Sequence, residues 1–515
     1  MPRPLTMKIL QVLRAVALFA SWFAVGHGAE VGTATAAAEP GGSVAPERAA
    51  LHYRPTDTVL GDVHPFHENG TWHLFYLKPG FHSAVAQSTD LLHWSPGTLQ
   101  FAAATGDDTF RPYFVLGVFR DARCDVYRSF YGCRSWMVGS VSADLRTWSP
   151  APREVRVPPR PDLYASQRDP YVFHNANDGR YWCVATCRVK NASPGRDGAV
   201  GYTTSPDLVH WERWEHLLYP GNIGEPECPQ LFELGGSWYL LASVHDRAVG
   251  RPSYWVAKAP TGPWSVAGSG YLDGKDLCAA QVASDGRRLL LFGWIPLRAS
   301  SPGTQHWGGH LALPREVVQL GSGELTTRLP AELAQAVRGA PVESISTRSA
   351  AATAGTWTPG ASELRFEGGA APGRALWPGR HDCGDLELDI VLSHETRRAG
   401  VFLERSADGP AIEVALERQP DRLVIQTRSG AIHAEIPVAS PPSGPMRLHV
   451  LFEQDIVEAF LDDRYSLVAR TPHNLSPSGV GVFAEGAPTT FHNVRLFHLR
   501  GQATWDGLPS PSPTP

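Results

Sequence analysis

The sequence lacks any long apolar run. No stretch of 18 or more consecutive apolar residues occurs in its 515 positions, so we expect no membrane-spanning helix. Charge of both signs is scarce at 19%, and the 46 Lys and Arg are outnumbered by 51 Asp and Glu, which leaves a net charge of −5. A nucleic-acid partner requires a basic face, and this balance argues against one.

Cysteine is also scarce, with seven in the chain. No Cys or His pairs have zinc-finger spacing, so we expect no structural metal and no cofactor. Cys183 and Cys187 read as positions i and i+4 of one strand, too far apart to bond each other.

The residues that are present favour a folded, mostly β protein. Hydrophobic residues make up 43%, including 16 Trp, which is enough to bury large cores. The chain also contains 50 Gly and 44 Pro, and stretches with helical periodicity are few. Its length suggests two or three domains.

The N-terminus has the pattern of a secretory signal. Three basic residues precede the apolar run Ala15 to Val25, and small residues follow it up to Ala29. We therefore predict a cleaved signal peptide at 1–29, a flexible leader at 30–50, and a secreted or periplasmic protein. In that oxidising setting we expect a disulfide between Cys124 and Cys133, across a loop.

Two patterns repeat through the first part of the chain. One is Ser-x-Asp-Leu-x-x-Trp, which we interpret as structural: the Asp caps a turn and the Trp packs between sheets. It occupies residues 88–94, 142–148 and 205–211. The other is a Gly-containing turn followed by a short strand, found five times. The copies are Asn69–Trp72, Gly132–Trp136, Asp178–Tyr181, Gly235–Trp238 and Asp285–Arg288.

Five such units predict a five-bladed β-propeller over residues 51–335. After a linker at 336–355, residues 356–500 alternate apolar and polar positions, which predicts a C-terminal β-sandwich. Residues 501–515 are predicted to be a disordered tail. The predicted fold class is therefore all-β, a propeller followed by a sandwich.

Three carboxylates stand at the start of an inner strand in three different blades. They are Asp62, Asp169 and Glu227. The centre of a propeller can bring together residues that lie over a hundred positions apart. Glycoside hydrolysis needs one carboxylic acid to protonate the leaving oxygen and a second carboxylate as nucleophile or base.

The surroundings of these residues resemble a known family. Arg168-Asp169-Pro170 and Glu227-Cys228-Pro229 resemble the Arg-Asp-Pro and Glu-Cys motifs of glycoside hydrolase family 32, the invertases, levanases and inulinases. Further matches are His73–Tyr76, Phe292–Trp294, Trp307–His310, Leu313–Glu316 and, in the predicted sandwich, Val457–Asp463. The resemblance spans residues 55 to 498.

By this resemblance Asp62 is the nucleophile of a retaining mechanism, Glu227 the general acid/base, and Asp169 the transition-state stabiliser. Glu225 lies close to the acid position, but the Cys-Pro context favours Glu227. The expected substrate-binding residues are Arg168, His64, Gln281, Trp94 and Trp294.

The chain departs from the family around the sugar subsite. Gly61 replaces the Asn that usually precedes the nucleophile, and Val63-His64-Pro65 replaces Pro-Asn-Gly. Leu77 replaces a Gln, and Leu277-Cys278 replaces an aromatic pair. We expect His64, His67 or Gln281 to rebuild the lost hydrogen bonds.

The resemblance implies a secreted β-fructosidase-like hydrolase whose partner is a carbohydrate, a fructan or fructosyl oligosaccharide. Three alternatives stay open. They are an arabinanase- or xylosidase-like hydrolase with the same propeller, a fructosyltransferase, and a carbohydrate-binding protein without catalysis.

Overall fold

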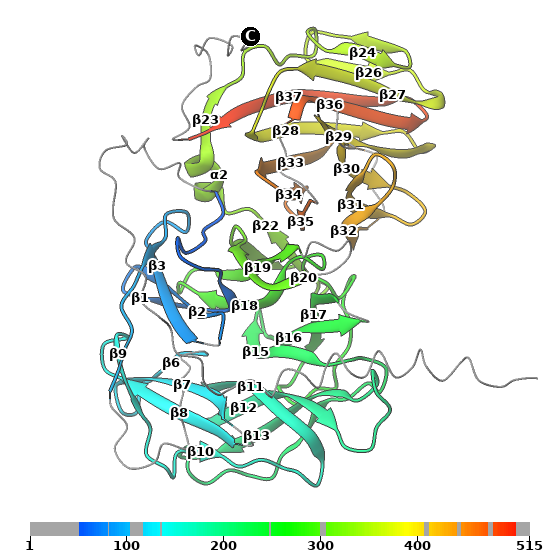
Figure 1. Ribbon diagram of the computed structural model, residues 1–515. Helices are drawn as coiled ribbons and strands as arrows, with labels where there is room; N and C mark the ends of the chain where they lie inside the picture. The colour runs from blue at the N-terminus through cyan, green and yellow to red at the C-terminus, as the bar shows by residue number, and fades with distance from the viewer. Residues whose placement is uncertain are drawn as a thin grey trace, which may run out of the picture. The chain divides into compact units, whose positions relative to one another are not determined.

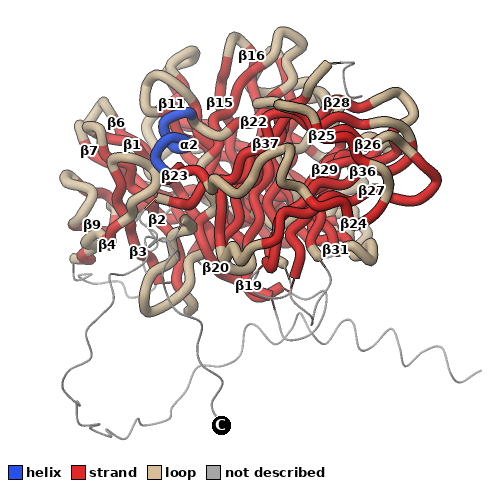
Figure 2. Tube along the Cα trace, turned by 90° about the horizontal axis from the view of Figure 1, so that it is seen from above, coloured by secondary structure: helices blue, strands red, loops and turns tan. Residues whose placement is uncertain are grey.

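The computed structural model describes residues 51–80, 82–102, 117–133, 136–246, 249–298, 305–405, 411–439, 444–471 and 477–500. The predicted signal peptide, leader and tail lie outside these residues. Strands dominate the described chain, and the one helix drawn there is α2 (Ala331–Val337) (Figure 2). No helix of the described residues is long and apolar enough to cross a membrane.

Five sheets follow one another along the chain, and in Figure 1 their colour passes from blue to green. The first contains β1 (Gly61–Glu68), β2 (Thr71–Lys78), β3 (His82–Ser88) and β4 (Ser95–Pro96). The second contains β5 (Gln100–Phe101), β6 (Phe119–Asp121), β7 (Val126–Cys133), β8 (Trp136–Ser142), β9 (Thr147–Pro150) and β10 (Arg156–Val157). The third contains β11 (Tyr164–Asn175), β12 (Arg180–Val189), β13 (Gly198–Ser205) and β14 (Glu215–Leu218).

The fourth sheet contains β15 (Pro226–Leu234), β16 (Ser237–Asp246) and β17 (Val249–Ala257). The fifth contains β18 (Cys278–Ser284), β19 (Leu289–Arg298), β20 (Gln305–Leu311), β21 (Arg315–Gln319) and β22 (Leu325–Arg328). These sheets are the five blades of the predicted propeller. The ring is closed by backbone pairing between Leu60 and Gly309, whose amides each donate to the other's carbonyl (3.3 and 2.8 Å).

The Ser-x-Asp-Leu-x-x-Trp repeat forms the turn that follows the third strand of a blade. In the first copy Asp90 Oδ1 accepts the backbone N–H groups of Leu92 and His93 (3.0 and 2.8 Å). Leu91 has a positive φ of 68°, and the Trp94 indole donates to its carbonyl (3.0 Å). The copies at 142–148 and 205–211 repeat these contacts, which confirms the structural interpretation of the motif.

Two sheets form the predicted sandwich. One contains β23 (Arg338–Pro341), β25 (Trp357–Pro359), β26 (Glu363–Phe366), β28 (Cys383–Leu392), β33 (Met446–Glu453), β34 (Ile456–Leu461), β35 (Tyr465–Arg470) and β37 (Thr489–Leu499). The other contains β24 (Ala351–Ala354), β27 (Gly369–Pro378), β29 (Thr396–Arg405), β30 (Ile412–Glu417), β31 (Arg422–Thr427), β32 (Ile432–Pro437) and β36 (Pro477–Gly486).

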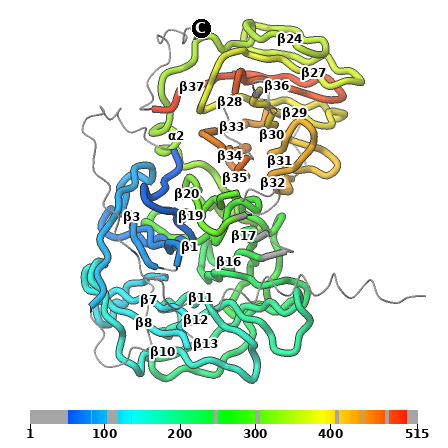
Figure 3. Tube along the Cα trace, viewed as in Figure 1, coloured from blue at the N-terminus to red at the C-terminus, as the bar shows by residue number. Residues whose placement is uncertain are grey.

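Figure 3 shows the last strands, β36 and β37, among strands formed much earlier in the chain. β36 pairs with β27 and β29, and β37 pairs with β26 and β28, so both occupy interior positions of their sheets. Apolar side chains of both sheets make one core between them. The segment 336–355, predicted as a linker, contributes β23 and β24, because its small residues fit short strands at sheet margins.

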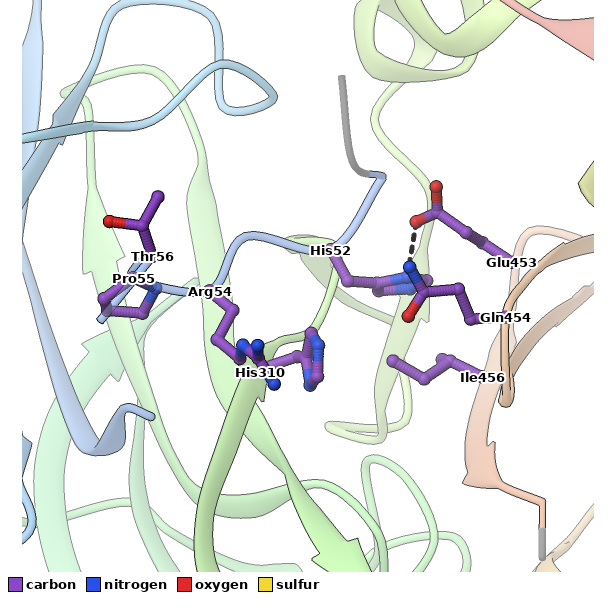
Figure 4. A pocket seen from close by; sticks show the side chains of 8 residues that line it. All are labelled: His52, Arg54, Pro55, Thr56, His310, Glu453, Gln454 and Ile456. Carbon is purple, nitrogen blue, oxygen red and sulfur yellow. Dashed lines mark ion pairs between the residues drawn. The ribbon is translucent and has the colours of Figure 1, made fainter. Parts of the chain in front are cut away.

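A buried ionic cluster lies where the strands β33 to β35 contact the fifth blade. The Arg315 guanidinium contacts Glu458 (2.7 Å) and Asp273 (3.2 Å). His52 Nε2 lies 3.0 Å from Glu458, and its Nδ1 lies 3.6 Å from Glu453. Burial alone would lower the pKa of His52, but the two carboxylates raise it above its ordinary value. His52 and Glu453 line part of a cavity of about 250 Å³ (Figure 4).

The cysteine predictions have different outcomes. Cys183 and Cys187 lie on one strand, β12, as predicted. The predicted Cys124–Cys133 disulfide is wrong, because the structure places no bond between the two thiols. Cys124 lies just before β7 and Cys133 ends it, so an extended strand holds them roughly 25 Å apart. A disulfide needs Cα atoms within about 7 Å of each other.

Candidate active site

The inner strands of four described blades share one backbone irregularity. Their pairing with the second strand skips two residues, as in a β-bulge, and the first skipped residue has a positive φ although it is not glycine. These residues are Asp62 (45°), Asp169 (51°), Cys228 (50°) and Ala279 (44°). A bulge redirects the side chains of its strand, and non-glycine residues with positive φ concentrate at functional sites.

This register places the three predicted carboxylates at two adjacent positions of the bulges. Asp62 and Asp169 occupy the same position of their bulges. Glu227 stands one residue earlier, the position that Arg168 holds in the third blade and Gly61 in the first. The bulges bring the three side chains close together. Their proximity is visible in the pKa of Asp62, which the charges of Asp169 and Glu227 both raise.

Asp62 has an unusually weak acid group. Desolvation by the surrounding protein, followed by the negative charges of Asp169 and Glu227, raises its pKa to about 7. The indole N–H groups of Trp307 and Trp294 act in the opposite direction and stabilise the carboxylate. Trp294 Nε1 is buried and has no hydrogen-bond partner at bonding distance among the described residues. Its N–H dipole therefore acts on Asp62 by stabilising the ionised carboxylate.

Asp169 is held by the second strand of its own blade, which in turn contacts the next blade. Its Oδ2 lies 3.1 Å from the Thr186 hydroxyl, which also contacts the Pro226 carbonyl (2.9 Å). Desolvation raises the pKa of Asp169, and Glu227 adds to this, while the Arg168 guanidinium 3.4 Å away opposes it. Asp62 and Asp169 therefore resist ionising together.

Arg168 lies at the centre of the charged group. Its Nη2 contacts one oxygen of Glu227 and one of Glu225. All three side chains are about one-third exposed (Arg168 33%, Glu227 36%, Glu225 27%), so they can be reached from solvent. The arrangement can bind a hydroxyl-rich ligand and present the carboxyl groups of Glu225 and Glu227 to it.

Gly61 has a specific steric role beside Asp62. A Cβ at Gly61 would lie 2.6 Å from Cζ2 of Trp307, closer than carbon atoms can approach. The Trp307 ring therefore covers the backbone where the family usually has an Asn side chain. Trp307 and Trp294 lie with ring centroids 6.0 Å apart, so two indoles border Asp62.

The predicted substrate-binding residues have different surroundings. His64 follows the first bulge, and burial lowers its pKa to about 4, which leaves the ring neutral at neutral pH. Gln281 is buried, and its side-chain amide donates to the Cys228 carbonyl (2.5 Å), which ties the fifth blade to the fourth. Their proposed contacts with sugar stay predictions.

Trp94 is not brought to the carboxylates. It follows β3, whose last residue Ser88 pairs with Trp72 beside the β1–β2 turn, at the opposite end of the blade from Asp62. Its ring packs on Phe292 of the fifth blade (6.4 Å between centroids). As the tryptophan of the turn motif it serves packing between blades.

One group of side chains in the described residues has ligand atoms close enough for a metal ion: Asp385, Glu387 and His449. It lies in the sandwich. The Arg338 guanidinium bonds both carboxylates (2.8 and 2.6 Å) and already supplies a positive charge there.

The comparisons with known proteins identify the family of the chain. The glycosyl hydrolases family 32 N-terminal domain matches residues 52–328, just over half of the chain. The chain belongs to glycosyl hydrolase family 32. All four bulges of this family 32 protein lie inside the matched region.

This chain is similar to several known proteins at low identity. It is 27% identical to sucrose-6-phosphate hydrolase from Escherichia coli over 316 residues, 52% of this chain and 61% of that protein. An exo-inulinase from Aspergillus awamori has the same fold, with a TM-score of 0.62 and 16% identity over 88% of this chain and 99% of that one. A β-fructofuranosidase from Bombyx mori follows with a TM-score of 0.59 and 17% identity, over 87% and 93%.

Sequence reasoning missed several residues of the site. Trp307 stood inside a recognised motif, and the missing side chain at Gly61 was the signal that an aromatic ring fills its place. Glu225 was weighed only as an alternative acid. Two residues before Glu227 on an extended segment, it faces the same side, which is how both reach Arg168.

Proposed function

We propose that this family 32 protein is a secreted retaining glycoside hydrolase that cleaves β-fructosyl bonds of fructans or fructosyl oligosaccharides. The observation that carries the proposal is the convergence of Asp62, Asp169 and Glu227 around Arg168, on the bulges of three blades. The similar proteins named above, a sucrose-6-phosphate hydrolase, an exo-inulinase and a β-fructofuranosidase, support the fructosyl substrate.

In the first step the ionised Asp62 attacks the anomeric carbon of the sugar and forms an ester. The glycosidic bond breaks as Glu227 gives its proton to the leaving oxygen. In the second step Glu227 takes a proton from water, the water oxygen bonds to the anomeric carbon, and Asp62 is released as carboxylate. Two inversions give net retention of configuration.

Asp169 and Arg168 bind the sugar and stabilise the transition state. A carboxylate fixed by Thr186 and Arg168 can accept hydrogen bonds from sugar hydroxyls that strengthen as positive charge develops on the ring. The two indoles around Asp62 replace the hydrogen-bonding Asn of the family with apolar surface, on which a sugar ring can pack.

Three substitutions test the roles. Asp62→Ala should abolish turnover, because no other group can form the ester. Glu227→Gln should slow natural substrates by about 10²- to 10⁴-fold, yet spare substrates with good leaving groups in the first step, and azide should rescue it. Asp169→Asn should reduce kcat. Turnover by Asp62→Ala at the wild-type rate would exclude this mechanism.

Product analysis tests the substrate and the stereochemistry. The protein is incubated with sucrose, inulin, levan and arabinan, and NMR follows the first-formed sugar. We expect release of fructose with retained configuration. Release of sugar from arabinan alone would identify the arabinanase-like alternative. Transfer of fructose to a second sugar would identify the fructosyltransferase, and no turnover of any substrate would identify the carbohydrate-binding protein.

Export rests on the N-terminal sequence pattern alone. Expression of the full chain in a bacterial host should give a mature protein whose N-terminus lies near Ala29, as N-terminal sequencing would show. An intact N-terminus and retention inside the cell would contradict secretion.

A further inference from the structure

A ladder of alternating charges leads from the edge of the third blade to Glu227. Asp197 contacts Arg188 (2.7 Å), Arg188 contacts Glu225 (3.2 Å), and Glu225 contacts Arg168. Arg168 in turn contacts Glu227 through the same Nη2 atom. Its members come from β11, β12, the segment before β13, and the segment that enters β15.

Two features fix Glu225 in this ladder. The segment before Glu225 lies directly on β13, where the Gly198 amide donates to the Ile223 carbonyl (3.2 Å). A Cβ at Gly198 would overlap the Gly224 carbonyl oxygen, so this close approach needs glycine. On β12, Arg188 lies on the same face as Thr186, which contacts Pro226. The backbone on both sides of Glu225 is therefore anchored.

We infer that Glu225 and Arg188 are positioning residues, which divide the Nη2 group of Arg168 between two carboxylates and so leave Glu227 able to hold the proton that it donates. The inference rests on the proposed function, because it assigns these residues to the acid/base step of that reaction. Neither residue is required to touch the reacting atoms.

The physical reason lies in what one guanidinium does to one carboxyl group. An opposite charge within about 4–6 Å lowers a carboxyl pKa by about 1–3 units. A Glu227 paired with Arg168 alone would therefore be a poor proton donor. Glu225 competes with Glu227 for the same Nη2 group, and its negative charge favours the protonated form of Glu227. Arg188 pairs with Glu225 and so weakens both effects.

Other charged or ionisable groups also act around Glu227. They are Asp62 on β1, Asp169 and Arg168 on β11, Glu225 beside β15, Cys228 on β15, and Cys278 on β18. None of these is changed when Arg188 is replaced. A change at Arg188 therefore reaches Glu227 through Glu225 and Arg168.

The experiment measures kcat/KM against pH for a natural substrate with two single variants. Glu225→Gln should move the alkaline limb to lower pH by about one unit, a tenfold loss above the limb, because the Nη2 group of Arg168 then pairs with Glu227 alone. Arg188→Gln should move the same limb to higher pH, because Glu225 then draws more of Arg168 away. The double variant should behave as Glu225→Gln, not as the sum.

The matched control is Glu212→Gln, which breaks an Arg180–Glu212 pair (2.9 Å) on the outer part of the same blade. It should leave the pH profile unchanged. Thermal melting of every variant checks the fold, and substrates with good leaving groups should show no shift of the alkaline limb in any variant.

The outcomes separate this inference from the proposed function. If Glu227→Gln leaves natural substrates unaffected, the proposed function fails and the ladder loses its role with it. If Glu227→Gln slows them but Glu225→Gln and Arg188→Gln shift the limb in one direction, or not at all, this inference alone is overturned. An equal shift with Glu212→Gln would also overturn it.

Discussion

Replacing Asp62, the proposed nucleophile, with Asn should stabilise the folded protein by an amount that depends on pH. The pKa of Asp62 is raised from 3.8 to about 7. The folded protein therefore binds this proton more tightly than the unfolded chain does. The unfolding free energy of the wild type falls as pH rises from about 4 to about 7, and it stays reduced above that.

The size of the effect follows from the shift. A difference of about 3 units corresponds to about 4 kcal/mol. Asp62 is only half-buried and solvent screens the three charges, so we expect about 2 kcal/mol to be realised. Asn has the shape of the protonated Asp but cannot ionise. Asp62→Asn should therefore match the wild type near pH 4 and melt about 2 to 4 °C higher at pH 8.

The assay compares melting temperatures of variant and wild type at both pH values and takes the difference between the differences. The control is Asp207→Asn at an exposed turn, where the backbone N–H of His210 and the His210 side chain lower the Asp207 pKa. Because this lowered pKa lies well below 4, the stabilising charge is present at both pH values, so this variant should lose nearly the same stability at pH 4 and at pH 8. A pH-independent difference for Asp62→Asn would refute the reasoning.

Three further predictions concern the site and the junction. The acidic limb of kcat/KM should have its midpoint near pH 7, where Asp62 ionises, as a pH-rate profile would show; a limb near 4 would contradict it. Gly61→Asn should lower activity at least tenfold and cost about 1–3 kcal/mol in denaturant unfolding, because Trp307 fills the space; unchanged values would exclude the clash. His52→Gln should lose stability below about pH 6.5, and the loss should shrink as pH rises through the raised pKa of His52, measured by melting; a loss confined to alkaline pH would contradict the ion pairs.

Much of the fold could be predicted because it depends on local sequence patterns. The Ser-x-Asp-Leu-x-x-Trp turns and the Gly-containing hairpins each need only neighbouring residues, so their repetition revealed five blades. The carboxylates Asp62, Asp169 and Glu227 were found because each opens such a unit. The strands within segment 336–355 could not be predicted, since small residues are typical both of linkers and of short strands at sheet margins.

The errors arose where the answer depends on pairing between distant segments. Trp94 belongs to a packing motif, yet the same residue type is expected in sugar sites. The spacing of Cys124 and Cys133 suited a loop, but β7 extends between them. The bond from the Gln281 amide to the Cys228 carbonyl also depends on such pairing and could not be predicted, while the contact of Gln281 with sugar stays a prediction. No glycine marks the positive φ of Asp62, so the bulge was invisible in sequence.

The interior position of the last strands has a consequence for synthesis on the ribosome. The propeller ring can close once Gly309 has emerged, but neither sandwich sheet can be completed before β36 and β37, which end at Leu499, are made. At about 5–20 residues per second, the 190 residues between these points take roughly 10 to 40 s. For that interval the nascent sandwich strands expose unpaired edges, which makes them the part of the chain most in need of protection from aggregation.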